Sequence, residues 1–340
     1  MIADFGALEQ RLQRYSSAVD EEVRDLLKSD PRHAGLYDML RYHLGYQEAA
    51  GPGGKRLRPA LCLLVAESFG ADWGAALPAA TAVELVHQFS LIHDDIEDSS
   101  RLRRHRETLW ARWGMAQAIN AGDALLIVSH QALAEVEPRL VPEIAVQALA
   151  LLDRTCRDLC EGQYLDLAWE AFPAVSVEEY LAMVERKTAR LFECAAKLGA
   201  LCSGASLQAQ QQIGRFARAL GLAFQVADDI AGVWSEPADT GKLAAEDIVS
   251  RKKALPATLA LSSSHPEAAR LRQVLAVDRN LDQSETQEAI TLLNAMGIRE
   301  QAQLLLERFR EEAVEHLGEA APGAQVAELL YFTELALPRG

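Results

Sequence analysis

The sequence predicts an all-α protein, and three observations support this prediction. Helical periodicity rich in Ala, Leu, Glu, Gln and Arg recurs along almost the whole chain. No convincing run of alternating apolar and polar residues bounded by turn residues indicates a strand. Hydrophobic residues make up 49% of the 340 residues, which is enough for a large core. With no linker and no internal repeat, we expect one large helical bundle that forms a single domain over residues 1–340.

The predicted helices are separated by residues that favour turns and caps. The glycines and proline of residues 51–54 interrupt the chain before a helix that begins near Pro59. Ser176 is expected to cap a helix with Glu179 three residues later, and Ser284 another with Gln287. The helices are expected at 4–28, 34–48, 59–69, 74–98, 107–118, 121–134, 142–170, 177–199, 207–235, 254–262, 266–276, 284–294, 297–318 and 323–336.

Composition excludes several classes of function. There are 49 acidic residues against 34 lysines and arginines, so the net charge of −15 disfavours binding to nucleic acid or to an anionic membrane. The N-terminus has no signal-peptide pattern, and no apolar run reaches the roughly 18 residues of a membrane span. The odd count of five cysteines predicts a reducing compartment, and we interpret Cys156 and Cys160 as core residues. We expect a cytoplasmic protein without stable membrane insertion.

Three carboxylates gather at the end of the apolar helix expected at 74–98. Asp94 and Asp98 stack on one helix face, and Asp95 lies beside them. Such a cluster repels itself and opposes the negative end of the helix dipole. A bound cation would resolve the conflict, and Mg²⁺ prefers oxygen ligands. The alternative is a solvated acidic helix end.

A second acidic pair lies near the end of the apolar helix expected at 207–235. Asp228 and Asp229 follow an apolar stretch, with Gln225 one turn earlier. One such pair is weak evidence for a metal site, but two pairs on two apolar helices are stronger evidence. If the helices face each other in a bundle, the carboxylates would line a shared cavity.

Basic residues complement these carboxylates. Lys55, Arg56 and Arg58 adjoin a glycine turn, which suits binding of a diphosphate. Residues 101–106, RLRRHR, directly follow the first acidic cluster. Isolated lysines, each of which could be an ordinary surface residue, lie at Lys187, Lys242, Lys252 and Lys253.

The order of these motifs resembles that of the trans-isoprenyl diphosphate synthases, also called polyprenyl synthetases. The matching segments are GGKRLRP, LIHDDIED with arginines downstream, a lysine–threonine pair, FQVADD, and GK and KK before LP. They cover residues 50–256, and more loosely the whole chain. The resemblance implies an all-α bundle with a central cavity, a homodimer, and three magnesium ions in each active site.

The resemblance also implies a role for each matching residue. Five aspartates would hold the metal: Asp94, Asp95, Asp98, Asp228 and Asp229. The allylic diphosphate would be bound by Arg103, Lys187, Lys242 and Lys252, and isopentenyl diphosphate by Lys55, Arg58, His87 and Arg104 with help from Arg56. Thr188 and Gln225 would be polar groups beside the reacting carbons, and Gln163 occupies another familiar position. The two diphosphates would react head to tail, through an allylic cation.

The sequence also departs from the family pattern. Gly232 stands where the family usually has a third aspartate, and we expect a metal affinity lower by about 10–100-fold, as when a group behind the ligands is lost. After the first motif, Arg101, His105, Glu107 and Trp110 replace a commonly acidic residue, a glycine, a proline and a histidine. These changes bear on substrate choice more than on the reaction.

Product length is expected to depend on the helix before the first motif. Phe89 lies five residues before Asp94, which is about 7.5 Å along the helix axis, and could close the pocket for the growing tail. Ordinary core packing is the alternative. Ser90 beside it is small, and this combination resembles geranylgeranyl (C20) synthases, with a C15 product next. Two other functions stay open at this point, a terpene cyclase and a catalytically silent partner subunit.

Overall fold

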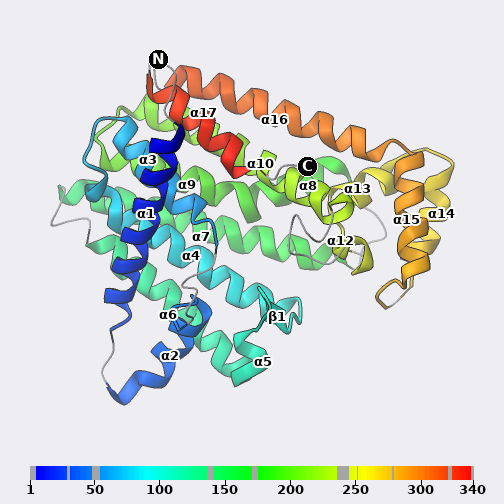
Figure 1. Cartoon of the computed structure of the whole chain (residues 1–340), viewed down its shortest axis with the longest axis horizontal. Coiled ribbons are helices and arrows are strands. Elements are labelled where there is room, and N and C mark those ends of the chain that lie inside the picture. Colours follow the sequence, from blue (N-terminus) through cyan, green and yellow to red (C-terminus); the bar gives the residue numbers. More distant parts are fainter. Residues whose placement is uncertain are drawn as a thin grey trace. The chain divides into compact units, whose positions relative to one another are not determined.

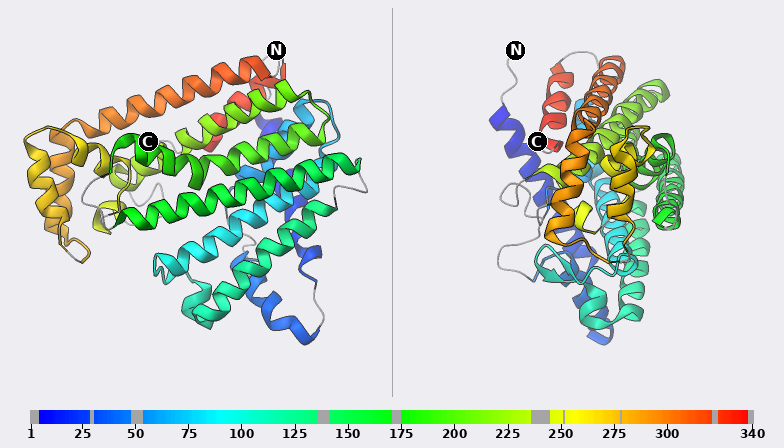
Figure 2. Two further views of the ribbon diagram at one scale, coloured as in Figure 1. Left: turned by 180° about the vertical axis from the view of Figure 1, so that it is seen from behind. Right: turned by 90° about the vertical axis from the view of Figure 1, so that its right-hand side faces the viewer.

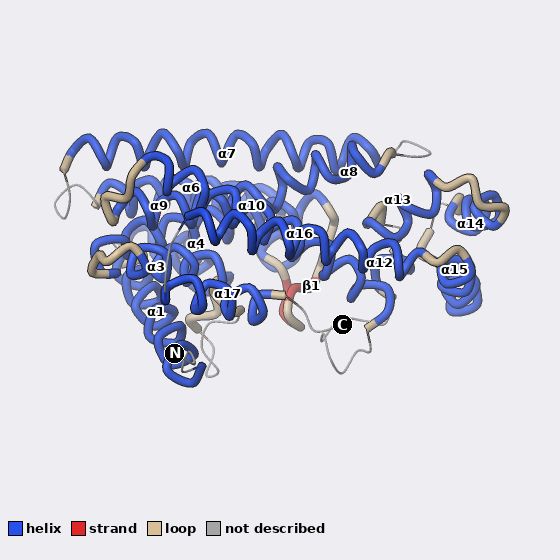
Figure 3. The backbone as a smooth tube through the Cα atoms, turned by 90° about the horizontal axis from the view of Figure 1, so that it is seen from above, coloured by secondary structure: helices blue, strands red, loops and turns tan. Residues whose placement is uncertain are grey.

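The computed structural model describes residues 5–28, 31–47, 54–135, 141–170, 175–235, 245–250, 252–277, 279–320 and 324–337. It divides into two compact units, Met1–Cys156 with Cys194–Ile213 and Ala320–Leu329, and Arg157–Glu193 with Gly214–Glu319 and Leu330–Gly340. We call them unit 1 and unit 2. The described residues are almost entirely helical, which confirms the predicted all-α class (Figure 3). The single domain and its central cavity stay predictions.

Most of the elements labelled in Figure 1 lie wholly within unit 1 or wholly within unit 2. Unit 1 contains α1 (Phe5–Leu26), η1 (Pro31–His33), α2 (Ala34–His43), α3 (Leu57–Ser68), η2 (Trp73–Ala76), α4 (Leu77–Glu97), β1 (Leu102–Arg103), β2 (Arg106–Glu107), α5 (Leu109–Trp113) and α6 (Met115–Ala134). Unit 2 contains α8 (Val177–Val184), η3 (Glu185–Ala189), α12 (Glu246–Val249), α13 (Leu255–Ser262), α14 (Glu267–Leu275) and α15 (Gln283–Ala295). The remaining helices contribute residues to both: α7 (Pro142–Glu170), α9 (Arg190–Cys202), α10 (Leu207–Trp234), α16 (Ile298–Ala320) and α17 (Ala324–Ala336).

Helix α4 is the central helix of unit 1. It begins with Pro78 in its first turn, where a missing N–H costs nothing, and its side chains are buried on most faces. Helix α6 runs beside it (Figure 2). Gly122 of α6 makes a close approach possible, because a Cβ there would lie 2.3 Å from Nε2 of His93. The segment Trp73–Glu97 is long and apolar enough to span a membrane, but 72% of its apolar window is buried inside the protein, as in a core helix.

A small hairpin follows the first acidic motif, where the sequence predicted no strand. Leu102 pairs with Glu107 and Arg103 with Arg106, so Arg104 and His105 form a two-residue turn. Both have positive φ (51° and 63°), as a type I′ turn requires. The helix expected at 107–118 is therefore wrong. Strand β2 occupies its first residue, and Gly114, with φ 86°, separates α5 from α6.

The core of unit 2 lies between the end of α10 and helices α12 to α15. Val233, Ile248, Leu271 and Leu293 are among its buried side chains. Helices α14 and α15 lie side by side (Figure 2). The capping box of Ser176 and Glu179 at the start of α8 is confirmed.

The cap predicted at Ser284 is wrong by two residues. Asp282 caps α15 instead, because its carboxylate accepts from the N–H groups of Ser284 and Glu285. The carboxylate of Glu285 in turn accepts from the backbone N–H of Asp282. Either residue type suits this position, so the sequence alone did not discriminate between them.

The interpretation of Cys156 and Cys160 as core residues is also wrong. Cys160 is exposed and Cys156 is half-buried on α7, whereas Cys62, Cys194 and Cys202 are buried in unit 1. Cys156 and Cys160 do lie one turn apart on the same helix, but neither is buried.

Candidate active site

The first acidic motif forms the last turn of α4. Its three carboxylates differ in burial: Asp94 is half-buried, Asp95 is only 2% exposed, and Asp98 is exposed. The backbone N–H of Asp98 donates to the carbonyl of Asp94 at 2.8 Å, so the helical spacing predicted for these two residues is confirmed. The motif thus combines one enclosed carboxylate with two that reach toward solvent.

Asp95 is held by an ion pair with the hairpin. Nε of Arg103 donates to its Oδ1 at 2.8 Å. Burial raises the pKa of Asp95 to about 6, although the guanidinium of Arg103 lowers it, and the charges of Asp94 and Asp98 add to the rise. The hairpin therefore helps to position the acidic end of α4.

Arg56 is more buried than Lys55 or Arg58, with 6% of its surface exposed. Its guanidinium contacts the carboxylates of Glu84 and, at 2.9 Å, Asp20. Burial acts to lower the pKa of Arg56, but the attraction of Glu84 and Asp20 outweighs it and the pKa is raised. These contacts indicate that Arg56 stabilises unit 1, and its part in binding isopentenyl diphosphate stays a prediction.

Arg58 and His87 lie together, as expected for partners in one binding site. Nη1 of Arg58 is 3.4 Å from Nε2 of His87. Burial, followed by the positive charge of Arg58, holds the pKa of His87 well below its usual range. The imidazole is therefore neutral at pH 7. Lys55 is exposed, and Gly54 lies against the guanidinium of Arg104, where a Cβ would be 2.7 Å from Nη2.

A cavity of about 240 Å³ lies beneath the hairpin of unit 1. Its lining includes Asp95, Arg103, Arg104 and Arg106. His43 lines it too, and burial, followed by the positive charge of nearby arginines, lowers the pKa of His43 to about 3. Charged groups from the first motif and the hairpin thus meet in one hollow.

Phe89 and Ser90 lie on α4, five and four residues before Asp94, respectively. Phe89 is buried, and its ring meets the imidazole of His93 edge to face with 5.1 Å between centroids. The hydroxyl of Ser90 donates to the carbonyl of His87 at 2.8 Å. The role of these two residues in setting product length stays a prediction.

The second acidic motif, in unit 2, encloses Asp229. This residue is 4% exposed, and its Oδ2 accepts from the hydroxyl of Tyr180 and, at 2.8 Å, from the N–H of Leu255. Its Oδ1 accepts from Nε2 of Gln225 at 2.8 Å. Burial raises its pKa to about 6 against these three donors. Asp228 is half-buried on the same helix.

A π-helical turn, η3, carries Lys187 and Thr188. Nζ of Lys187 lies 2.5 Å from the carboxylate of Asp166, and the hydroxyl of Thr188 donates to Oε1 of Gln225 at 2.9 Å. Two glycines let neighbouring helices approach this turn. A Cβ on Gly162 would lie 2.4 Å from the backbone N of Lys187, and one on Gly221 would lie 2.6 Å from Cα of Ala189. Such turns often mark functional sites.

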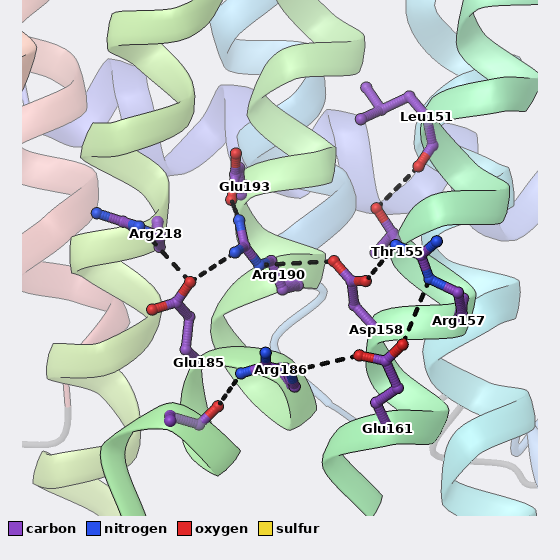
Figure 4. Close-up of polar contacts among 11 residues, drawn as sticks. Leu151, Thr155, Arg157, Asp158, Glu161, Glu185, Arg186, Arg190, Glu193 and Arg218 are labelled. Carbon is purple, nitrogen blue, oxygen red and sulfur yellow. Dashed lines mark hydrogen bonds and ion pairs between the residues drawn. The ribbon is translucent and has the colours of Figure 1, made fainter. Parts of the chain in front are cut away.

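A network of ion pairs brackets the same turn (Figure 4). Arg190 contacts Glu185 at 2.6 Å, Glu193 at 2.7 Å and Asp158 at 3.6 Å. Glu185 also contacts Arg218 of α10 at 3.5 Å. These pairs tie η3 to α7 and α10, and so fix the segment that presents Lys187 and Thr188.

The structure brings the predicted residues together in two groups. In unit 1 the first motif lies with Arg103, and Arg58 with His87; in unit 2 Asp229, Gln225 and Thr188 form one hydrogen-bonded chain. Lys242 lies outside the described residues, and Lys252 is exposed.

Sequence reasoning missed four residues of these groups, namely His43, Asp166, Tyr180 and Asp247. Asp166 follows Gln163 by three residues in the motif EGQYLD, which was a usable signal. Tyr180 donates to Asp229 and lowers the pKa of that carboxyl, and the charge of Asp247 raises it, but neither residue stands in a sequence pattern that marks it.

The donor chemistry of both motifs suits Mg²⁺. Carboxylate oxygens are its preferred protein ligands, and the ion commonly takes one or two of them together with water and substrate phosphate. Among the residues that the structure describes, no group of three histidine, cysteine, aspartate or glutamate side chains is close enough to hold a metal alone. The carboxylates of both motifs are ligands of the kind that Mg²⁺ takes in proteins.

An all-α fold with two aspartate-rich helix ends places the chain in the class of isoprenoid synthase folds, and comparison with known proteins specifies the family. The polyprenyl synthetase family model matches residues 41–293. The chain belongs to this family. A solved polyprenyl synthetase from Streptomyces coelicolor A3(2) is 34% identical and aligns with a TM-score of 0.89 over 98% of this chain and all of that one.

Two curated relatives have printed activities. A (2E,6E)-farnesyl diphosphate synthase from Mycobacterium tuberculosis is 43% identical over 65% of this chain and 62% of its own length. A geranylgeranyl diphosphate synthase from Methanosarcina mazei is 36% identical over 91% of each chain. The match to the farnesyl diphosphate synthase thus spans less than two thirds of the length of that relative.

Proposed function

We propose that this protein is a magnesium-dependent prenyltransferase that condenses isopentenyl diphosphate head to tail with allylic diphosphates. Geranylgeranyl diphosphate (C20) is the proposed product, with the C15 diphosphate next. The observation that carries the proposal is the pairing inside each acidic motif. One aspartate is buried and bonded by the protein, Asp95 or Asp229, and it adjoins a less buried aspartate, Asp94 or Asp228, which is the proposed ligand-binding residue.

Asp94, Asp98 and Asp228 are the proposed principal metal ligands. Asp95 and Asp229 are assigned a positioning role, because their oxygens already accept bonds from Arg103 and from Tyr180, Leu255 and Gln225. When bound, Mg²⁺ neutralises charge on the departing diphosphate. Three ions per site follow only from family resemblance.

The basic residues divide between the two substrates. Arg103, Lys187, Lys242 and Lys252 are assigned to the allylic diphosphate, and Lys55, Arg58, His87 and Arg104 to isopentenyl diphosphate. His87 is assigned a hydrogen bond to this diphosphate, beside the charge of Arg58. The fixed cations supply the rest of the electrostatic stabilisation as negative charge develops on the leaving group.

Thr188 and Gln225 are proposed to face the reacting carbons. Their mutual bond, and the bond from Gln225 to Asp229, fix the Gln225 amide in one orientation. An oriented amide oxygen and hydroxyl stabilise a transient allylic cation without attacking it, and an apolar, water-poor surrounding suppresses its hydrolysis. The released diphosphate is the proposed proton acceptor.

Phe89 is proposed to form the floor of the tail pocket, since it is buried on α4 five residues before Asp94. Replacing Phe89 with alanine should lengthen the product by one or more C5 units. Analysis of the products by chromatography checks this, and an unchanged chain length would remove Phe89 from the proposal. A homodimer in the cytoplasm, without nucleic acid or stable membrane insertion, completes the proposed setting.

The proposal is tested by incubating the protein with Mg²⁺, labelled isopentenyl diphosphate and each of the C5, C10 and C15 allylic diphosphates. We expect label to appear in a C20 diphosphate, and EDTA to abolish its formation. Consumption of an allylic diphosphate without incorporation of label, or no turnover with any substrate, would contradict the proposal.

A further inference from the structure

Tyr42, near the end of α2, joins that helix to the hairpin of unit 1. Its side chain is buried, and its hydroxyl donates to the backbone carbonyl of Glu107 in β2 at 3.0 Å. The guanidinium of Arg106, in the same strand, donates to the backbone carbonyl of Tyr42. One residue thus holds β2 through two hydrogen bonds, one to its side chain and one to its backbone.

The ring of Tyr42 also carries two cations. Cζ of Arg106 lies 4.2 Å and Cζ of Arg112 lies 4.5 Å from the ring centroid. The indole of Trp113 meets the ring edge to face, with 5.0 Å between centroids. A guanidinium over an aromatic face is attracted by the ring quadrupole, and more strongly where water is excluded. The ring therefore ties α2 to both β2 and α5.

Trp110 holds the base of the hairpin. Its Nε1 donates to the carbonyl of Ser100 at 2.9 Å, and the hydroxyl of Thr108 donates to the same oxygen at 2.8 Å. The N–H of Thr108 donates to the carbonyl of Arg101 at 3.0 Å, and Cζ of Arg101 lies 5.4 Å from the Trp110 ring. These contacts join the two ends of the hairpin. We call Tyr42 and Trp110 the aromatic anchors.

The hairpin between the anchors carries a costly turn. Arg104 and His105 have φ of 51° and 63°, a left-handed conformation that costs free energy for residues other than glycine. Such conformations persist where the surrounding structure determines them. Burial, followed by the positive charges of Arg56 and Arg103, lowers the pKa of Arg104, so like charges are also crowded here. The turn therefore depends on support from the residues around its base.

We propose that the aromatic anchors are positioning residues, which hold the arginines of the hairpin in place before a diphosphate binds. The inference rests on the proposed function, in which Arg103 binds the allylic diphosphate and Arg104 binds isopentenyl diphosphate. Each anchor acts through the hairpin rather than on the substrate. Because the anchors keep the hairpin ordered, less conformational freedom is lost when a substrate binds.

Steady-state kinetics separates positioning from simple loss of folded protein. Tyr42→Leu removes the ring and the hydroxyl, so the KM for isopentenyl diphosphate should rise by about tenfold, as for loss of a buried cation–aromatic contact. Tyr42→Phe keeps the ring and should recover most of the wild-type KM. Loss of folded protein alone would lower the apparent kcat and leave KM unchanged. Tyr37→Leu, at a half-buried position of the same helix, is the matched control.

Hydrogen exchange of the ligand-free protein, followed by mass spectrometry, tests the anchors independently of turnover. Peptides that cover residues 101–108 should exchange several-fold faster in Tyr42→Leu and in Trp110→Leu, because local opening of the hairpin no longer breaks the anchoring contacts. Peptides of α15 in unit 2 should exchange at wild-type rates, which excludes global destabilisation. Tyr37→Leu should leave exchange of the hairpin unchanged.

The outcomes separate the proposal from the proposed function. Wild-type exchange of the hairpin in both leucine variants would overturn the proposal, as would a fall in kcat at constant KM. If a leucine variant did not fold, Tyr42→Phe and Trp110→Phe each remove one hydrogen bond, and wild-type exchange in both would be equally decisive. If wild-type protein turned over no prenyl substrate while exchange of the hairpin depended on both anchors, the anchoring would stand and the proposed function would fall.

Discussion

The two acidic motifs are similar in sequence but are stabilised differently. In unit 1, Asp95 is compensated by a charge, the guanidinium of Arg103, which belongs to the hairpin after α4. In unit 2, Asp229 is compensated by neutral donors, namely Tyr180, Gln225 and the N–H of Leu255. Both buried carboxyls nevertheless have a pKa of about 6, because burial is the largest contribution in each.

The comparison indicates that the two aspartates of each Asp–Asp pair have different roles. In each motif the second aspartate is the buried one, and the first is half-buried. We infer that the second aspartate positions the helix end and that the first binds the metal. Substitutions at these aspartates and at the residues that hold them test this division.

The largest effects should come from the first aspartate of each motif. Asp94→Asn and Asp228→Asn should each lower kcat by about 10⁴-fold, because each removes a metal ligand that stabilises the departing diphosphate by several kcal/mol. Steady-state kinetics with Mg²⁺ checks this. Circular dichroism should show that both variants keep the wild-type helix content, and losses of less than tenfold would refute their role as ligands.

The buried ion pairs of unit 1 should matter next. Arg56→Met leaves Glu84 and Asp20 uncompensated, so the free energy of unfolding should fall by about 3–5 kcal/mol. Urea denaturation measures this, with exposed Lys55→Met as the matched control. If Arg56→Met were as stable as the control and only the KM for isopentenyl diphosphate rose, Arg56 would be a substrate ligand after all.

Burial of Asp229 should make the stability of the metal-free protein depend on pH in a distinct way. Because its folded pKa is raised, this group favours folding below the ordinary aspartate pKa, and that contribution is lost as pH rises through about 6. The free energy of unfolding of Asp229→Asn, measured relative to that of wild type, should therefore rise by up to about 3 kcal/mol between pH 4 and pH 7. This figure corresponds to about 1.36 kcal/mol per unit of pKa shift.

Urea denaturation in EDTA at several pH values measures this change. Glu311→Gln, at an exposed position, should show no such trend. A stability difference between Asp229→Asn and wild type that stayed constant with pH would mean that the buried carboxyl titrates normally.

The smallest effect concerns the turn that carries Lys187. Gly162→Ala forces a Cβ against the backbone of Lys187, so the protein should lose about 1–3 kcal/mol of stability, and the KM for the allylic diphosphate should rise. Gly318→Ala, in open space on α16, should instead be neutral or stabilising by up to about 1 kcal/mol. Equal behaviour of the two variants would show that the close approach is not needed.

The sequence predicted the helices and the two acidic motifs well, because both depend on local spacing. The apolar runs before Asp94 and Asp228 identify α4 and α10, and the i, i+4 relation of Asp94 and Asp98 follows from helix geometry. The buried state of Asp95 could not be predicted, since it depends on Arg103 and the hairpin turn.

The features that sequence reasoning missed depend on contacts between distant residues. The turn at Arg104 and His105 lacks the glycine or asparagine that usually marks positive φ, although the family glycine that His105 replaces was a hint. Asp247 and Gly232 are 15 residues apart, and only packing of α12 on α10 brings them together. Gly162 and Gly221 are isolated glycines inside helices, and only the structure shows that the turn of Lys187 packs against them.

The central claim, that the first aspartate of each motif binds the metal, is most directly tested by calorimetry. The experiment would measure Mg²⁺-dependent binding of a non-cleavable allylic diphosphate analogue to wild type, Asp94→Asn and Asp228→Asn, with exposed Glu311→Gln as the control. We predict that each change at Asp94 or Asp228 weakens binding by at least about tenfold, because each removes a metal ligand. Unchanged binding after loss of either aspartate would contradict the claim.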